Sequence, residues 1–142
     1  MARDLFNDVK ITTVVAPGAA VTDNTAKVGA IIDNSGFDSL LYSWVLVTPD
    51  ADATFTPLLE ESDNSSLSGS NEVADADLIG TESGATDSAG NTTTKAWKLG
   101  YKGTKRYTRL TLTPAANTGN LYVAAVAIQG SARSLPQSSQ SV

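Results

Sequence analysis

The chain alternates between short runs of apolar or β-branched residues and clusters of turn residues. In two runs, residues 40–48 and 121–129, both alternating faces are mostly apolar. We expect these two runs to form central strands that are covered on both sides. Shorter runs predict further strands at residues 9–17, 27–32, 54–60, 94–101 and 107–113.

Turn residues separate these runs, and a long polar segment interrupts them. Pro57 lies inside one run and has no backbone N–H, so we expect an edge strand or a bulge there. Residues 62–93 are rich in Gly and Ser and predict a long polar loop that contains one short apolar piece, Leu78-Ile79. A loop of this length indicates a functional or mobile segment, the alternative being a disordered surface stretch.

About seven or eight short strands, spaced by about 8–12 residues, are typical of a β-sandwich, barrel or jelly roll. With 142 residues the chain is expected to form one domain. We place this β-domain at residues 1–132 and a flexible, Ser/Gln-rich tail at residues 133–142. The expected core consists of Leu40, Tyr42, Trp44, Leu46, Leu110, Leu112, Val123 and Val126.

Composition excludes several kinds of chemistry. The chain has no histidine and no cysteine, so catalytic triads based on histidine, thiol catalysis and thiolate metal sites have no residues to use. We therefore expect no enzymatic activity, no cofactor and no metal. No apolar run approaches the roughly 18 residues of a membrane span, and the net charge of −5 argues against nucleic acid as a partner.

The two signs of charge are separated along the sequence. Residues 33–87 contain twelve carboxylates and no Lys or Arg, whereas residues 95–133 contain seven cations and no Asp or Glu. One interpretation is a molecule with oppositely charged faces that contact other proteins. The other is that the two segments pair within one fold, and the two interpretations are compatible.

Cations and tyrosines alternate in the second segment, as they do in proteins that bind single-stranded nucleic acids. In an acidic chain, however, Arg and Tyr are better explained by contacts between proteins. We take as a candidate interface Lys98, Lys102, Lys105, Arg106, Tyr107 and Arg109.

Carboxylates also occur in close pairs, which suggests two further kinds of site. A pair on one strand face could serve acid–base catalysis, and an acidic loop could bind Ca²⁺ weakly, although EF-hand spacing is missing. We expect solvated turn carboxylates instead at Asp50/Asp52, Glu60/Glu61 and Asp75/Asp77.

Five segments in succession carry a resemblance to a known family: residues 33–40 (DNSGFDSL), 53–63 (ATFTPLLEESD), 76–81 (ADLIGT), 98–114 (KLGYKGTKRYTRLTLTP) and 117–119 (NTG). Their order resembles that of the capsid cement, or decoration, proteins that are encoded beside the major capsid protein of tailed bacteriophages. The resemblance covers roughly residues 25–132. No single motif in it is a catalytic signature, so its specificity comes from the order of the segments.

The resemblance implies a jelly-roll-like fold and a non-enzymatic role as a homo-oligomer on the outer surface of an icosahedral head, bound to the major capsid protein. Such a protein is made in the cytoplasm of the bacterial host and works on the virion. The apolar character of both faces in residues 40–48 and 121–129 independently favours a homodimer or homotrimer. The alternative is a glycan-binding β-sandwich on a virion or secreted surface. It needs an exposed aromatic platform, so two shielded tryptophans, Trp44 and Trp97, would count against it.

Overall fold

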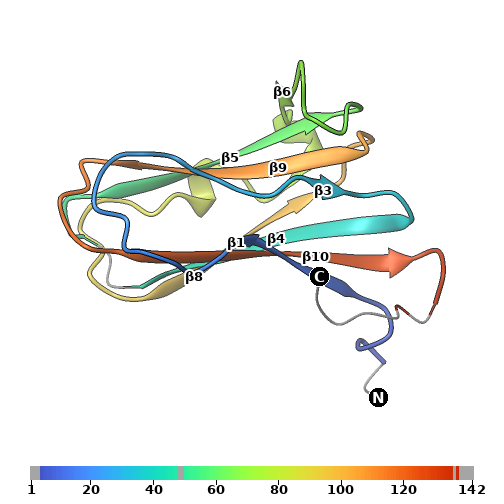
Figure 1. Cartoon of the computed structure of the whole chain (residues 1–142), viewed down its shortest axis with the longest axis horizontal. Coiled ribbons are helices and arrows are strands. Elements are labelled where there is room, and N and C mark those ends of the chain that lie inside the picture. Colours follow the sequence, from blue (N-terminus) through green and yellow to red (C-terminus); the bar gives the residue numbers. More distant parts are fainter. Residues whose placement is uncertain (1–3, 48–49, 136, 138–142) are drawn as a thin grey trace.

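The computed structural model describes residues 4–47, 50–135 and 137. Within these residues the chain forms an all-β, single-domain sandwich of two antiparallel sheets (Figure 1). The strands are β1 (Lys10–Val15), β2 (Lys27–Val28), β3 (Ile32–Asp33), β4 (Phe37–Val47), β5 (Thr54–Ser62), β6 (Asn71–Glu72), β7 (Leu78–Ile79), β8 (Lys95–Tyr101), β9 (Tyr107–Ala115) and β10 (Tyr122–Ala132). Two 3₁₀ turns, η1 (Asp75–Asp77) and η2 (Ser83–Ala85), complete the described elements.

The strand order is that of a jelly roll. The first sheet has the order β1-β10-β4-β8-β7, and the second has β2-β9-β5-β6 with β3 beside β9. If β2 and β3 are counted as one interrupted strand and the short β7 is left out, eight strands alternate between the sheets as 1-8-3-6 and 2-7-4-5. This arrangement confirms the predicted jelly-roll-like sandwich.

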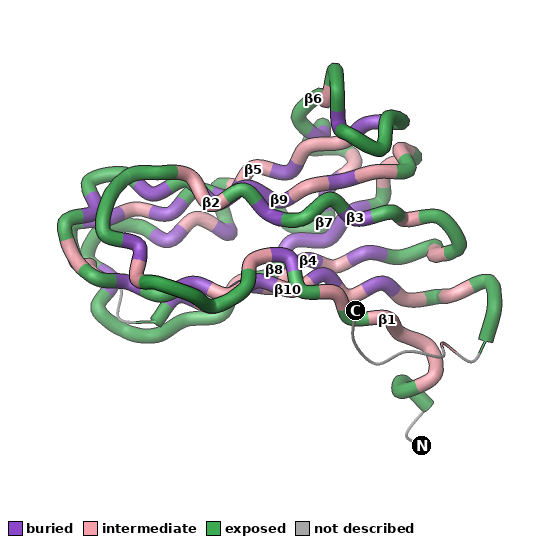
Figure 2. The backbone as a smooth tube through the Cα atoms, in the orientation of Figure 1, coloured by how far each residue is buried: buried purple, intermediate pink, exposed green. Residues whose placement is uncertain are grey.

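The core lies between the two layers, where buried positions alternate along the strands (Figure 2). Large side chains of β4 lie beside small ones of β10: Tyr42 pairs with Ala127, and Trp44 pairs with Ala125. Seven of the eight predicted core residues are buried. Val126 is the exception and the prediction for it was wrong: it is half-buried and faces outward, because its neighbours Ala125 and Ala127 occupy the inward positions.

The prediction that β4 and β10 are covered on both sides was also wrong for the single chain. On β4, Leu41 and Val45 are only half-buried and Val47 is exposed. No element of the described chain covers the outward side of the first sheet, which is its lower surface in Figure 1. β4 ends at Val47, and the last residue of the predicted strand, Thr48, lies outside the described residues together with Pro49.

The predicted strand at residues 27–32 is split where the chain contacts both sheets. The Gly29 N–H donates to Leu110 O of the second sheet, and the Ala30 N–H donates to Val14 O of the first. A Cβ at position 29 would lie 2.4 Å from Val14 Cγ1 and 2.6 Å from Leu110 O. Only glycine fits this close approach of three backbone segments.

The expectation for Pro57 is confirmed, because its nitrogen faces away from β9. Phe55 and Leu59, two residues before and after it, direct their N–H groups away from β9, toward Asp87 O and the Glu82 carboxylate. Pro57 lies between them on the same side, where a missing N–H breaks no ladder bond.

The long polar connection predicted at residues 62–93 is present, but it is ordered and packed. It contains β6, β7 and both 3₁₀ turns, and it buries apolar side chains at Leu67, Val73, Leu78 and Ala85. The alternative of a disordered surface stretch is wrong for this segment.

The chain continues past the last strand along the N-terminal segment. β10 ends at Ala132, and the Gln137 N–H then donates to Asn7 O at 3.0 Å. Much of the predicted flexible tail, residues 136 and 138–142, lies outside the described residues, so its flexibility stays a prediction. None of the helices among the described residues is long and apolar enough to cross a membrane.

Candidate functional site

The structure brings most of the candidate interface residues to one end of the sandwich. Lys102, Lys105 and Arg106 lie in the connection between β8 and β9, and Tyr107 and Arg109 follow on the outward side of β9. Lys98 is separate, because it points outward from β8 in the other sheet. The six residues therefore do not form one patch.

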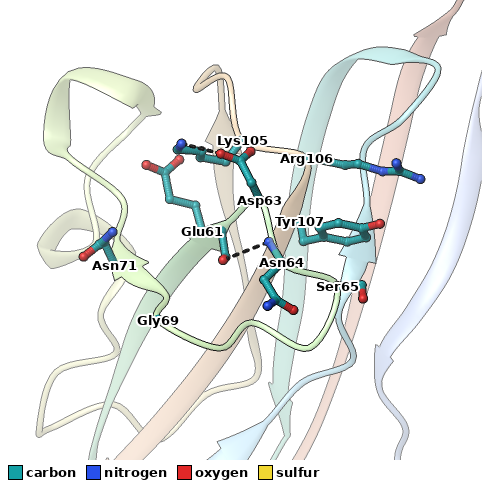
Figure 3. Close-up of a pocket in the computed structure, with 10 residues that line it drawn as sticks. Glu61, Asp63, Asn64, Ser65, Gly69, Asn71, Lys105, Arg106 and Tyr107 are labelled. Carbon is teal, nitrogen blue, oxygen red and sulfur yellow. Dashed lines mark hydrogen bonds and ion pairs between the residues drawn. The ribbon is translucent and has the colours of Figure 1, made fainter.

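A polar pocket of about 680 Å³ lies beside this end, between the β5–β6 connection and the β8–β9 connection (Figure 3). Figure 3 shows Lys105 and Asp63 directed toward each other, while Arg106 points away from them. The pocket is lined by Glu61, Ser62, Asp63, Asn64, Ser65, Gly69, Asn71, Lys105, Arg106 and Tyr107.

Tyr101 holds the β8–β9 connection in place. Its hydroxyl donates to Glu61 Oε2 at 2.7 Å and accepts from the Lys105 N–H at 2.9 Å. Gly103 lies against the Tyr101 ring, where a Cβ would approach ring atoms to 2.6 Å. The loop that carries the candidate cations is thus fixed to β5 through a buried tyrosine.

Three of the candidate cations form ion pairs with carboxylates of the same chain. Arg106 donates to both carboxylate oxygens of Asp33, at 2.9 and 2.8 Å, and its guanidinium lies 5.0 Å from the centre of the Tyr107 ring. The other two pairs are Lys105–Asp63 and Arg109–Glu60. Lys98 and Lys102 have no ion-pair partner among the residues that the structure describes.

Every ion pair found in the described chain joins the acidic segment to the basic segment. The fourth, Arg133–Asp38, follows the same rule as the three above. The interpretation that the two segments pair within one fold is therefore confirmed for these residues. The contact interpretation stays open for Lys98 and Lys102, the two candidate cations without an ion-pair partner in this part of the chain.

These contacts shift the ionisation of the groups involved. Hydrogen bonds from Arg106 hold the pKa of Asp33 below its usual range, and the Lys105 ammonium lowers the pKa of Asp63 in the same way. Burial raises the pKa of the Tyr101 hydroxyl, and its hydrogen bond to Glu61 raises it further. Burial also raises the pKa of Glu82, which accepts the Leu59 N–H at 2.6 Å on the edge of β5. All four groups have structural partners.

The close carboxylate pairs show no acid–base geometry. Glu60 and Glu61 point in opposite directions, the first to Arg109 and the second to Tyr101. Asp50 closes a turn by accepting from Thr118 N and Oγ1 at 2.8 and 3.1 Å. Among the described residues, no group of three or more Asp and Glu is placed to hold a metal ion.

Both tryptophans point inward, and they are cross-strand neighbours on β4 and β8. Trp44 is buried, and Trp97 packs against the core with its indole N–H enclosed. The described tryptophans therefore offer no platform for a sugar ring.

A buried polar network between the sheets was missed by the sequence analysis. Tyr42 Oη lies 2.8 Å from Thr108 Oγ1, which also accepts from Asn34 Nδ2 at 3.2 Å. Gln129 Nε2 donates to Asp33 O at 2.8 Å and to Asn34 Oδ1 at 3.3 Å. The sequence did show polar residues at alternate positions of apolar runs. This pattern does not indicate which face of the strand is buried, so it could not predict the network.

Comparison with known families finds no matching family model, and comparison with curated proteins finds no matching sequence.

Proposed function

We propose that this protein is a non-enzymatic structural protein of a phage particle that binds the outer surface of the capsid, as a homo-oligomer, and stabilises the major capsid protein lattice. The resemblance of five ordered segments to capsid cement proteins supports the proposal. So does the jelly-roll sandwich, the fold that the resemblance implies.

One observation supports the proposal beyond the resemblance: the first sheet has an exposed, mostly apolar outward side. Its exposed apolar residues include Ile11, Ile79 and Tyr122. Exposed apolar areas of this kind mark interaction sites. The charged groups around the β8–β9 connection form ion pairs and hydrogen bonds within the chain. They do not point toward a common reaction centre.

The test is attachment to capsid shells that lack the protein. Purified protein is mixed with undecorated heads built from the major capsid protein of the same phage, and bound protein is measured by co-sedimentation. We expect saturable binding and heads that resist heating better. The proposal is wrong if the heads bind none of the protein even when the protein concentration is well above that of the capsid subunits.

The glycan-binding alternative gains no specific support, because the described tryptophans face the core. A glycan array serves as the second arm of the same study. Specific binding to a glycan, without attachment to heads, would favour that alternative.

A further inference from the structure

The outward side of the first sheet is not covered by any described element of the chain. Cross-strand neighbours form apolar rows: Ile11, Ile128 and Leu41 lie side by side, and Ala124 lies beside Val45 in a second row. Ile79 on β7 is 62% exposed and Ile11 on β1 is 45% exposed, at opposite edges. The second sheet differs, because its outward positions carry charged side chains such as Arg109, Glu60 and Glu72.

A groove of about 600 Å³ crosses this surface where several residues have small side chains or none. Gly100, Gly130 and Ser39 occupy outward positions on three neighbouring strands. A Cβ at Gly100 would lie 2.9 Å from Ile79 Cβ, so the isoleucine rests on the glycine backbone. At the β1 side the groove is bordered by Leu5, which is 67% exposed.

Two opposite charges lie at the two sides of the groove. Asp8 comes from the segment that leads into β1, and Lys98 comes from β8, with β10 and β4 between them. Neither forms an ion pair with any described residue of its own chain. Two copies can pack face to face around a two-fold axis that lies in the plane of the contact. If this axis passes midway between Asp8 and Lys98, each Asp8 lies opposite the Lys98 of the second copy. The surface is therefore complementary to itself, as an isologous interface requires.

The size of the surface also fits a dimer. The five strands contain 6, 11, 11, 7 and 2 residues. With a rise of about 3.4 Å per residue and a strand spacing of about 4.8 Å, the sheet face measures about 600 Å². Two such faces together give about 1,200 Å², the lower end of the range for specific, stable interfaces.

We propose that the outward face of the first sheet is the dimer interface of this protein, where a second copy packs face to face and Asp8 pairs with the partner's Lys98 at each side. This inference deepens the homo-oligomer part of the proposed function, and it names the surface and the symmetry. Its test needs no capsid, so it can fail while capsid attachment succeeds, and the reverse.

The experiment is sedimentation velocity of the full chain over a dilution series that reaches tens of micromolar. The wild type should be a dimer that dissociates on dilution. Ile11→Glu with Ile79→Glu should raise the dissociation constant at least about tenfold, because each change buries charge in the contact. Val28→Glu is the matched control: Val28 is 59% exposed on the outward side of the second sheet, and its replacement should leave the dissociation constant unchanged.

A charge exchange tests the pairing itself. Lys98→Asp alone sets two carboxylates against each other at each side and should weaken the dimer, whereas adding Asp8→Lys should restore it. A thermal melt of each variant checks that the fold is intact. A wild type that stays monomeric, a trimer, or a double isoleucine variant that dimerises as well as the wild type would each overturn the inference.

Discussion

At the scale of single residues, the interior combines close packing with a few buried polar contacts. Tyr42 and Thr108 belong to different sheets, and both side chains are fully buried. Each hydroxyl is removed from water and needs a hydrogen-bond partner within the protein, and the two hydroxyls bond to each other. Burial raises the pKa of the Tyr42 hydroxyl, consistent with a neutral group in an apolar setting.

The Thr108→Val variant tests how much this hydrogen bond contributes to the free energy of unfolding. Valine has nearly the same shape, but it leaves the Tyr42 hydroxyl and the Asn34 amide without their partner, at a cost of about 1–3 kcal/mol. Adding Tyr42→Phe removes one stranded group, so the double variant should lose less than the sum of the two single losses. Urea denaturation of the four proteins measures this difference, and strictly additive losses would contradict the interaction.

Gly29 is the residue where the backbone approach is tightest. Gly29→Ala forces a methyl group against Val14 Cγ1 and Leu110 O, and overpacking of this kind costs about 1–3 kcal/mol. Gly18→Ala is the control, because its Cβ would lie 4.0 Å from the nearest other atom, Ala16 O. We expect a change within about 0.5 kcal/mol for the control in the same denaturation series. Equal effects at both positions would show that the close approach is relaxed in solution.

At the scale of elements, the free side of β5 shows how the sandwich protects an edge. Phe55 exchanges backbone hydrogen bonds with Asp87, and the Leu59 carbonyl accepts the Val73 N–H. The Leu59 N–H finds the Glu82 carboxylate, and Pro57 has no N–H to satisfy. The long polar connection thus covers a sheet edge that would otherwise pair with other chains.

The pKa of Glu82 predicts how stability depends on pH at this edge. A carboxyl whose folded-state pKa is raised disfavours the native state once it ionises, so stability falls as the pH rises through its unfolded pKa and its folded pKa. Glu82→Gln keeps an oxygen for the Leu59 N–H and removes the charge. Its melting temperature should therefore exceed that of the wild type at pH 7 and approach it near pH 4.

Asp33→Asn provides a comparison of opposite sign. The pKa of Asp33 is lowered by Arg106, so its stabilising effect is present above the unfolded pKa and lost as the pH falls through the folded one. The Asp33→Asn variant should melt below the wild type at pH 7. If Glu82→Gln lowers the melting temperature at pH 7, the carboxylate is needed at the β5 edge.

The positions of the strands could be predicted from the sequence better than which face of each strand points into the core. A period of two predicts both long strands, but in β10 both faces are apolar and the pattern alone does not choose between them. The choice depends on β4: Trp44 and Tyr42 fill the interior, which leaves room only for Ala125 and Ala127 beside them. How the side chains of two neighbouring strands pack together cannot be judged from the sequence of either strand alone. This explains why Val126 was wrongly placed in the core.

The candidate site was predictable to a similar degree. The cations and Tyr107 stood out as a group, and five of the six lie at or next to one connection. Their ion-pair partners did not stand out, because they are 42 to 73 residues away in the sequence. Only the strand order, which sets β9 beside β3 and β5, shows that Arg106 and Arg109 meet carboxylates.

At the scale of the whole molecule, folding brings together some of the charges that are separated along the sequence. Other charges form no ion pair with a described residue. Four cations are paired across the two segments, and the carboxylates of η1 form no ion pair with a described residue. The two outward faces also differ: that of the first sheet is mostly apolar, whereas that of the second carries charged side chains such as the Arg109–Glu60 pair. If the protein contacts an acidic neighbour, we expect that contact to involve cations without an ion-pair partner in the described chain, such as Lys98 and Lys102.

Lys102 and Lys105 separate these two roles within one loop. Lys105 pairs with Asp63, while Lys102 has no ion-pair partner in the described chain and is bound there through its backbone N–H, which donates to Asp77 O. Lys102→Glu should slow attachment to undecorated heads and flatten the dependence of that rate on salt, because exposed interface charges act mainly on association. Its melting temperature should match that of the wild type.

Lys105→Glu should behave in the opposite way, because it replaces an internal ion pair by two facing carboxylates. We expect a lower melting temperature, of the modest size that exposed ion pairs allow, and an attachment rate close to the wild type. Both quantities are measured on both variants by light scattering of heads and by thermal melts at two salt concentrations. If Lys102→Glu attaches as fast as the wild type, this connection does not face the capsid, and the contact lies elsewhere on the sandwich.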